Sequence, residues 1–592
     1  MGLLNPTQAL PMRRWLPWSL LPLGAGAAVA ARVGFEPPIL PVGVLLLVQV
    51  GLLLAYGVAL PFVFRSPDPV RRLGWWGAWR RAVTSIGRKV EDAQPPTAAD
   101  GVLLVVLPIV GLGLWGTRWS DVGVLLLDAA AMAAALLALG RGAGEVLRRS
   151  NAPGLLLPLT FLFIIVLGTM LLKLPVCHPH TALTWTDALF TSTSAVCVTG
   201  LTVRSTAADF SPAGQAVIAG LIQTGGLGIV LFGAMYAWLL SGRLSLRERV
   251  SVRDALEHRS LADVRNFIAT VLLSVLVIEL IGAAALYALW PAQEGETPGQ
   301  RVGHAVFHAI SAFCNAGFDL TGSSLTGLRT HATTQVVMAL LIVTGGLGFP
   351  LLMDLGNWCR VRLTGGVRRG LSLHSKITLL TTLGVHAIGA GAIFGAQAGV
   401  ADTGVGLLTH AADANFMAIS SRTAGFNSVA MTSLAPASIV MIAALMFVGG
   451  SPGSTAGGTK TTTLGVLVLS VVATIRGRAE TEAFGRAIPE ALVRRAGAVA
   501  VCMIALVLGA SVVLCASEQA DPAALVFESI SAATTTGLSL GVTPTLSDPG
   551  KLIVAATMFL GRVGPLALLG VLVVRKAPSR RYLYPREDLT LG

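Results

Sequence analysis

Twelve apolar stretches of roughly membrane-crossing length constrain this sequence of 592 residues more than any other feature. A helix needs about 20 mostly apolar residues to cross a bilayer. The stretches are 15–32, 39–64, 101–116, 122–140, 155–173, 213–240, 266–290, 333–356, 374–398, 435–472, 495–516 and 551–574. The third is short, and the tenth is too long for one unbroken span.

Composition supports the same interpretation. Hydrophobic residues form 54% of the chain and charged residues only 12%, whereas soluble domains carry about 25% charged residues. These values exclude a disordered chain, a fibre, a disulfide-rich secreted domain and a cytosolic enzyme. We therefore expect an all-α polytopic membrane protein.

The distribution of positive charge predicts the orientation in the membrane. With a cytoplasmic N-terminus, Arg and Lys gather in the internal segments 65–97, 141–150, 243–265, 360–372, 476–494 and the tail from 575. The opposite side has scattered cations such as Arg118, Arg204, Arg301 and Arg329. Because cytoplasmic loops are enriched in Arg and Lys, we expect both termini in the cytoplasm. The net charge of +13 then requires no nucleic-acid partner.

A short segment that ends in glycine recurs four times among the last eight stretches, each time between two spans and too short to cross the membrane. The segments end Ser-Ala-Val-Cys-Val-Thr-Gly-Leu at 194–201, Ser-Ala-Phe-Cys-Asn-Ala-Gly-Phe at 311–318, Ser-Ser-Arg-Thr-Ala-Gly-Phe at 420–426 and Ser-Ala-Ala-Thr-Thr-Thr-Gly-Leu at 531–538. Three have Ser six places before the glycine, and the third has Ile419. The pattern predicts four units of helix, re-entrant pore helix, glycine turn and helix around a pseudo-fourfold pore.

Such turns have few uses inside a membrane. Non-helical backbone is tolerated there only when it is buried in protein or lines a water-filled cavity. One segment alone would be better explained as a tight loop between packed helices. Four in register predict a common axis, where carbonyl oxygens replace the hydration shell of a cation. The half-helices would point their partly negative C-terminal ends at the centre, which also favours a cation.

Further irregularities fit this scheme. The tenth stretch is interrupted by a Gly-rich segment with Pro452, which cannot continue a stable helix and is interpreted as a gate. Lys460 follows it, and Arg562 is a second intramembrane cation, in repeat four. Glu279 is the main buried acid and is expected to pair with a nearby cation. The glycines at 225–228 and 345–348 either let helices pack closely or line the pore.

The four glycine segments, the interrupted tenth stretch and Arg562 resemble the Trk/Ktr/HKT superfamily of potassium transporters. The closest resemblance is to its KtrB and TrkH membrane subunits, and it covers about residues 150–592. The apolar stretches predict an N-terminal extension of about four helices at 1–150, which departs from the family, ahead of repeats at 151–260, 261–370, 371–480 and 481–592, the last including a cytoplasmic tail. The family's core has eight spans, so the role of residues 1–150 stays open, as does the choice between the two subfamilies.

The resemblance also implies roles for individual residues. The expected K⁺ filter consists of Cys197, Val198, Thr199, Gly200, Cys314, Asn315, Ala316, Gly317, Arg422, Thr423, Ala424, Gly425, Thr534, Thr535, Thr536 and Gly537. The expected gate loop consists of Gly449, Gly450, Ser451, Pro452, Gly453, Ser454, Thr455, Ala456, Gly457, Gly458, Thr459 and Lys460. Arg562 would be a pore-side cation, and Arg422 would contribute backbone while its side chain points behind the filter.

The same resemblance implies passive or sodium-assisted uptake of potassium across a bacterial plasma membrane. It implies a homodimer and a cytosolic ring of nucleotide-binding regulatory subunits, KtrA-like or TrkA-like. A separate ring is consistent with the chain, in which no strand leads into a Gly-x-Gly-x-x-Gly fingerprint. No covalent cofactor is expected.

Two other classes of function remain as alternatives. A secondary transporter of a small anionic or organic solute would need half-helix N-termini aimed at its site, opposite to the orientation expected here. A membrane enzyme has little support, because the six cysteines form no Cys-x-x-Cys pair and no Ser/His/Asp constellation is evident. His304 and His308 are four residues apart without a carboxylate beside them, so we expect helix packing or hydrogen bonding rather than metal binding.

Overall fold

The computed structural model describes residues 156–178, 183–241, 262–291, 295–364, 370–398 and 406–564. The chain divides into two compact units, Met1–Pro153 with Leu174–Cys177, and Gly154–Lys173 with His178–Gly592. The second unit holds nearly all of the described residues. The predicted N-terminal extension and the predicted cytoplasmic tail lie outside them.

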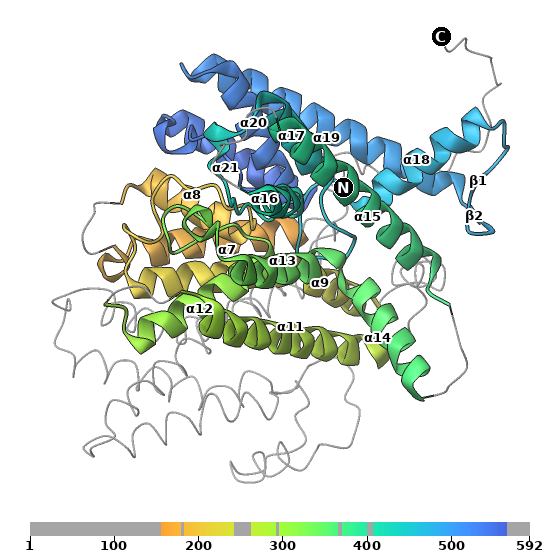
Figure 1. Ribbon diagram of the computed structural model, residues 1–592, viewed down its shortest axis with the longest axis horizontal. Coiled ribbons are helices and arrows are strands. Elements are labelled where there is room, and N and C mark those ends of the chain that lie inside the picture. Colours follow the sequence, from red (N-terminus) through yellow and green to blue (C-terminus); the bar gives the residue numbers. More distant parts are fainter. Residues whose placement is uncertain are drawn as a thin grey trace, which may run out of the picture. The chain divides into compact units, whose positions relative to one another are not determined.

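The described part of the chain is predominantly helical, as predicted (Figure 1). Its elements are α7 Leu156–Leu172, η4 Pro175–Cys177, α8 Trp185–Val196, α9 Pro212–Ser241, α11 Ala262–Leu289, α12 Pro298–Cys314, η5 Thr326–Leu328, α13 Ala332–Leu347, α14 Phe349–Thr364, α15 Leu373–Gln397, α16 Leu407–Ser420, η6 Met431–Ser433, α17 Pro436–Phe447, α18 Thr461–Ile475, β1 Thr481–Ala483, β2 Arg486–Ile488, α19 Glu490–Ser517, α20 Pro522–Thr534, η7 Thr543–Thr545 and α21 Asp548–Val563. The antiparallel hairpin β1–β2, which pairs Thr481 with Ile488, is not among the predicted elements.

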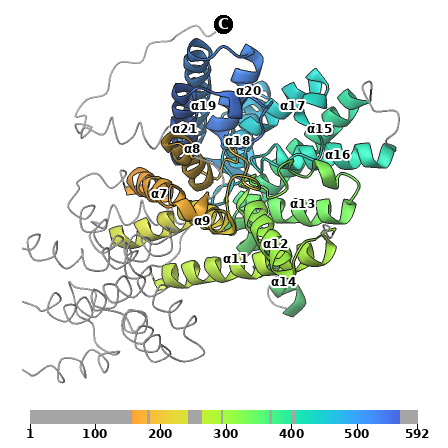
Figure 2. The ribbon, with the colours of Figure 1, turned by 90° about the vertical axis from the view of Figure 1, so that its left-hand side faces the viewer.

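The helices of the second unit form four groups around a common centre (Figure 2). The groups are α7–α9, α11–α14, α15–α18 and α19–α21. In each group one helix leads directly into a glycine segment, and α8, α12, α16 and α20 are therefore called the short helices below, after the predicted re-entrant helices. Neighbouring groups touch in chain order through α9 with α12, α13 with α16, and α17 with α20, and α21 with α8 closes the circle.

Local sequence explains where the short helices begin. Thr184 caps α8 by accepting a hydrogen bond from the backbone N–H of Asp187 at 3.0 Å. Thr297 and Gln300 form a reciprocal capping box at α12. Asp521 caps α20, with Pro522 in its first turn. These caps satisfy N–H groups that have no partner inside the helix, so α8, α12 and α20 each start at a defined residue. Gly406, before α16, makes no such side-chain cap.

Several helices match the predicted spans closely, including α9 with 213–240, α11 with 266–290 and α15 with 374–398. By length and composition, three helices within the described ranges can cross a membrane: Ile268–Leu289, Leu373–Gln397 and Glu490–Ser517. A bent pair, α13 with α14, is a fourth candidate if it counts as one span.

The predicted span 333–356 is wrong as a single straight helix. The chain bends by 102° between α13 and α14. Gly348 lies at the bend with φ of +83°, a backbone conformation that side chains disfavour, and Pro350 follows two residues later. The predicted interruption of the tenth stretch is confirmed, because α17 ends at Phe447 and α18 begins at Thr461.

Candidate functional site

The four glycine turns share one backbone conformation. In each, the glycine has a positive φ, between +71° and +94°: Gly200, Gly317, Gly425 and Gly537. Two residues earlier, each turn has a non-glycine residue in the left-handed region: Val198, Asn315, Thr423 and Thr535. Non-glycine residues seldom adopt this conformation, and strained backbone of this kind concentrates at functional sites.

A serine holds the beginning of each turn. The residue before the glycine donates its backbone N–H to the carbonyl of Ser194, Ser311, Ser420 or Ser531, at 2.8–2.9 Å. The serine hydroxyls add a second restraint. Those of Ser194 and Ser531 accept from the N–H of Gly200 and Gly537, and those of Ser311 and Ser420 donate to the carbonyl of the Phe after the glycine. Ser420 thus takes the structural place of the missing serine in the third segment, one residue closer to its glycine.

The turns meet one another in a closed cycle. A Cβ added at Gly200 would lie 2.5 Å from the carbonyl oxygen of Ala316. A Cβ at Gly317 would lie 2.9 Å from Ala424 O, and one at Gly425 would lie 2.5 Å from Thr536 O. A Cβ at Gly537 would approach Thr199 O more closely still. The structure therefore brings all four predicted filter segments together, with carbonyl oxygens beside glycines that have no room for a side chain.

In three groups, the helix that follows the glycine turn (α9, α13 or α21) approaches the short helix closely at a further glycine. These three are called the second helices. A Cβ at Gly225, Gly345 or Gly561 would collide with the backbone carbonyl at the end of the short helix of its own group: Val196, Phe313 or Ala533 respectively. Each of these carbonyls is four residues before its turn glycine. For Gly225 and Gly345, where the sequence left two alternatives open, the structure shows close helix packing.

The predicted gate loop lies against these turns. The backbone N–H of Gly457 donates to Thr423 Oγ1 at 3.2 Å, and Thr455 Oγ1 donates to Phe313 O at 3.0 Å. The loop also binds the end of α13, because the N–H of Ser451 donates to Gly346 O at 2.9 Å. The loop thus contacts the C-terminal end of α12 and the third turn at the same time.

Three cationic side chains donate hydrogen bonds to backbone carbonyl oxygens of the loop, and one of them, Lys460, is the last residue of the loop itself. Arg562 is 4% exposed, and its guanidinium donates to Thr455 O at 2.7 Å and to Gly225 O at 3.1 Å. Lys460 Nζ donates to Ala456 O at 2.7 Å. Arg422 Nη2 donates to Gly449 O at 3.0 Å, so its side chain extends from the third turn to the loop. None of the three forms an ion pair within the described ranges.

Among the residues that the structure describes, Glu279 has no cation partner of the kind that the sequence led us to expect. Its carboxylate accepts from the side-chain amide of Gln223 at 2.9 Å, and its nearest further contact is the thiol of Cys314. Sequence reasoning placed Glu279 near a cation because unpaired buried charge is costly, but hydrogen bonds can offset that cost.

The two histidines pack and form hydrogen bonds. His304 contacts Glu296 at 2.9 Å, whereas His308 is fully buried against Trp290 and accepts from the N–H of Leu320 at 3.3 Å. No group of three metal-ligating side chains occurs among the residues that the structure describes.

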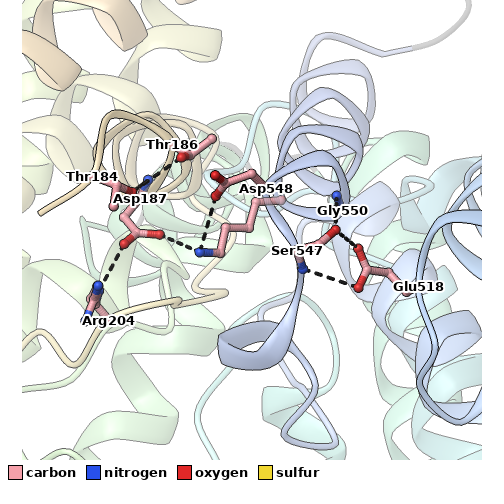
Figure 3. Close-up of polar contacts among 9 residues, drawn as sticks. Thr184, Thr186, Asp187, Arg204, Glu518, Ser547, Asp548 and Gly550 are labelled. Carbon is pink, nitrogen blue, oxygen red and sulfur yellow. Dashed lines mark hydrogen bonds and ion pairs between the residues drawn. The ribbon is translucent and has the colours of Figure 1, made fainter.

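Sequence reasoning missed two sets of ion pairs that involve the short helices. Asp187, in the first turn of α8, accepts from Arg204 at 3.0 Å and from Lys551 of α21 at 2.7 Å (Figure 3). Burial alone would raise the pKa of Asp187, but hydrogen bonds from Lys551 and Arg204 outweigh it and lower the pKa below its ordinary value. Asp413 of α16 likewise pairs with Arg329 at 2.7 Å. Lys551 is 364 residues from Asp187 in sequence, and Arg329 is 84 residues from Asp413, so no local sequence signal reveals these two pairs.

Comparison with known proteins identifies the family. A family model described as "TrkH: Cation transport protein" matches residues 150–583. The potassium/sodium uptake protein NtpJ of Enterococcus hirae is 35% identical over 453 residues, which cover 75% of this chain and 98% of the relative. The Ktr system potassium uptake protein B of Bacillus subtilis is 37% identical over 444 residues, 74% of this chain and 97% of the relative.

A solved structure agrees at the level of the fold. The potassium transporter TrkH from Vibrio parahaemolyticus matches with a TM-score of 0.57 at 17% identity, over 81% of this chain and 99% of that chain. With the family match over most of its length and two relatives above 30% identity, the chain is an integral membrane protein that belongs to the TrkH family of cation transport proteins.

Proposed function

We propose that this chain is the membrane subunit of a potassium uptake system and conducts K⁺ inward. The observation that carries this proposal is the cycle of four glycine turns, in which carbonyl oxygens of one turn lie beside the glycine of the next. The names of the relatives, which are potassium or potassium/sodium uptake proteins, support K⁺ as the cargo. The inward driving force is the membrane potential, about 2.3 kcal/mol per charge per 100 mV.

The proposed selectivity filter consists of the segments 197–200, 314–317, 422–425 and 534–537. Their carbonyl oxygens would replace the water around a dehydrated K⁺ ion. The C-terminal ends of α8, α12, α16 and α20 lead into these segments, and their partial negative charge favours a cation. Each segment has one glycine and the four differ in sequence, so we expect weaker discrimination against Na⁺ than in a fourfold-symmetric potassium channel.

The loop 449–460 is the proposed gate. Its hydrogen bonds to Thr423 and Phe313 hold it directly beside two filter segments. Arg562 adds a positive charge and binds the loop at Thr455. Movement of the loop away from the turns would open the path for the ion, and Arg562 would act as a pore-side cation that opposes conduction in the closed state.

The proposed setting is a bacterial plasma membrane, with both termini cytoplasmic. The name "Ktr system" of the Bacillus subtilis relative supports an assembly of several components. We propose a homodimer in which each subunit has its own pore, on a cytosolic ring of nucleotide-binding subunits. Sodium is the proposed activator.

Fluxes of rubidium and sodium into proteoliposomes that contain the purified chain test the proposal. Rubidium serves as the tracer for potassium. The wild-type chain should conduct rubidium faster than sodium, and Gly425→Ser should lose this preference because a side chain there meets Thr536 O. Gly384→Ser is the matched control, because a Cβ at this glycine of α15 meets nothing within 4 Å. A Gly425→Ser variant with wild-type selectivity would refute the filter assignment.

The same measurement separates the proposal from the secondary transporter of a small solute. A solute carrier built on broken helices would show solute-dependent current and little rubidium flux in the absence of its solute.

A further inference from the structure

Three polar side chains from three helices meet behind the second filter segment. Glu279 comes from α11, Gln223 from α9, and Cys314 is the last residue of α12 and the first of the segment 314–317. Gln223 Nε2 donates to Glu279 Oε2 at 2.9 Å. Cys314 Sγ donates to Gln223 Oε1 at 3.4 Å and lies 4.0 Å from Glu279 Oε1.

The trio is enclosed by protein. Cys314 is fully buried, Glu279 is 7% exposed, and Gln223 is half-buried. The nearest glycine of α9, Gly226, allows this approach, since a Cβ there would lie 2.8 Å from Cys314 Sγ. In the described part of the chain Glu279 forms no ion pair, so its hydrogen bonds alone offset the cost of burial.

Hydrogen-bond chemistry fixes the order of these contacts. An ionised carboxylate only accepts hydrogen bonds, whereas an amide has one accepting and one donating end. In its ionised form, Glu279 therefore requires Gln223 to present its NH₂ group to the carboxylate, as the structure has it. The amide oxygen of Gln223 then faces Cys314, whose thiol can donate to it. Through this relay the carboxylate of α11 determines what the first residue of the second filter segment contacts.

The other filter segments lack this arrangement. At the position equivalent to Cys314, Thr534 Oγ1 donates to its own helix at Ile530 O, and Arg422 donates to Gly449 O of the gate loop. Among the described residues, only the second segment has a carboxylate–amide relay behind it. The relay also joins the first and second groups of helices, because α9 belongs to one and α11 to the other.

We propose that Glu279 and Gln223 are positioning residues that hold Cys314, and with it the filter segment 314–317, in the conformation that prefers K⁺ over Na⁺. This inference rests on the proposed function, because it assigns the relay a part in selectivity. A preference between two monovalent cations depends on the positions of the carbonyl oxygens that coordinate them. A residue that holds one of the four filter segments in place therefore affects selectivity without contacting the ion.

The test compares rubidium-to-sodium flux ratios in proteoliposomes with equal amounts of folded protein. Glu279→Leu and Gln223→Leu should each lower the ratio by about tenfold, the size expected from loss of a buried hydrogen bond to a charged group. The double variant should be no worse than either single variant, because the two side chains act as one unit. The swap Gln223→Glu with Glu279→Gln should restore the ratio to within about twofold of wild type, because a carboxylate at 223 still accepts from the thiol and from the amide.

Thr334→Val is the matched control. It removes a buried hydrogen bond from α13 to Leu289 O of the same helix α11, away from the filter. Its flux ratio should equal that of the wild type. An unchanged ratio in Glu279→Leu, additive losses in the double variant, or a swap that fails to rescue would each overturn the inference.

A spectroscopic measurement separates failure of this inference from failure of the proposed function. The S–H stretching band of Cys314, identified by its absence in Cys314→Ala, should shift in both Gln223→Leu and Glu279→Leu, because the thiol loses its oriented acceptor. An unshifted band would refute the relay whatever the fluxes are. A shifted band in a chain whose wild type shows no rubidium preference would instead refute the filter and leave the contact itself intact.

Discussion

At the scale of single residues, the size and the charge of a few side chains determine how the backbone packs at the candidate site. Three glycines of the second helices, Gly225, Gly345 and Gly561, allow a backbone carbonyl of a short helix to approach where a Cβ would otherwise stand. For Gly225 and Gly345 the sequence could not distinguish close packing from pore lining, because both uses favour the same residue. The contact that decides between them joins residues from separate helices.

Gly345→Ala should destabilise the folded protein. The added methyl group collides with Phe313 O, and a carbonyl in a packed helix end cannot move aside without a backbone shift. Overpacking of this kind costs about 1–3 kcal/mol, seen as a lower thermal midpoint in detergent. Gly356→Ala in α14 is the control, since its Cβ meets nothing within 4 Å. Equal midpoints for the two variants would contradict the packing described.

Arg562→Gln should raise rubidium flux, up to about tenfold, because a positive charge beside a cation path opposes the ion and Arg562 also restrains Thr455. Arg562→Lys keeps the charge and should leave the flux low. Flux assays in proteoliposomes check this directly. If Gln and Lys at this position behave alike, the charge of Arg562 has no part in the closed state.

At the scale of elements, two predicted membrane spans are interrupted, and the sequence signals the two interruptions to different degrees. The break between α17 and α18 is predictable, because five glycines and a proline within eleven residues, 449–459, cannot form a stable helix. The bend at Gly348 is less evident, since glycine and proline are tolerated in membrane helices. Tertiary contacts fix that bend: the N–H of Phe349 donates to Gly453 O of the gate loop.

Thr455→Val should loosen the gate loop. Valine matches threonine in shape but removes the hydrogen bond from Oγ1 to Phe313 O, while the backbone contacts remain. We expect about a threefold to tenfold rise in rubidium leak through the chain alone, equivalent to the loss of about 1 kcal/mol. Thr474→Val, which removes a bond within α18 only, should have no effect. A leak no greater than that of the control would exclude a restraining role for Thr455.

At the scale of the whole molecule, long-range ion pairs close the circle of helices. Lys551 of α21 binds Asp187 of α8, which joins the last group to the first (Figure 3). Arg329, after α12, binds Asp413 of α16 and joins the second group to the third. Both acids are buried, so each pair replaces hydration that its carboxylate has lost.

Asp187→Asn should lower the free energy of unfolding by about 3–5 kcal/mol at neutral pH, because Lys551 loses its buried partner. The folded-state pKa of Asp187 is lowered, so its contribution is complete above the unfolded value of about 3.9 and is lost as the pH falls through the folded value. Thermal midpoints of wild type and variant should therefore differ by a constant amount from pH 7 to 5 and converge below about pH 4. Curves that stay parallel in acid would show that the ion pair contributes nothing.

The sequence by itself determined the class of protein, the helical stretches, the four glycine segments and the Gly-rich interruption. These depend on hydropathy, spacing and backbone freedom, which are local properties. Only the tertiary structure decided that the four turns meet in a cycle, that Ser420 replaces the serine missing six places before Gly425, and that Glu279 faces Gln223 instead of a cation. Such contacts join residues far apart in the chain, and the free energy of each depends on where the other helices place its partner.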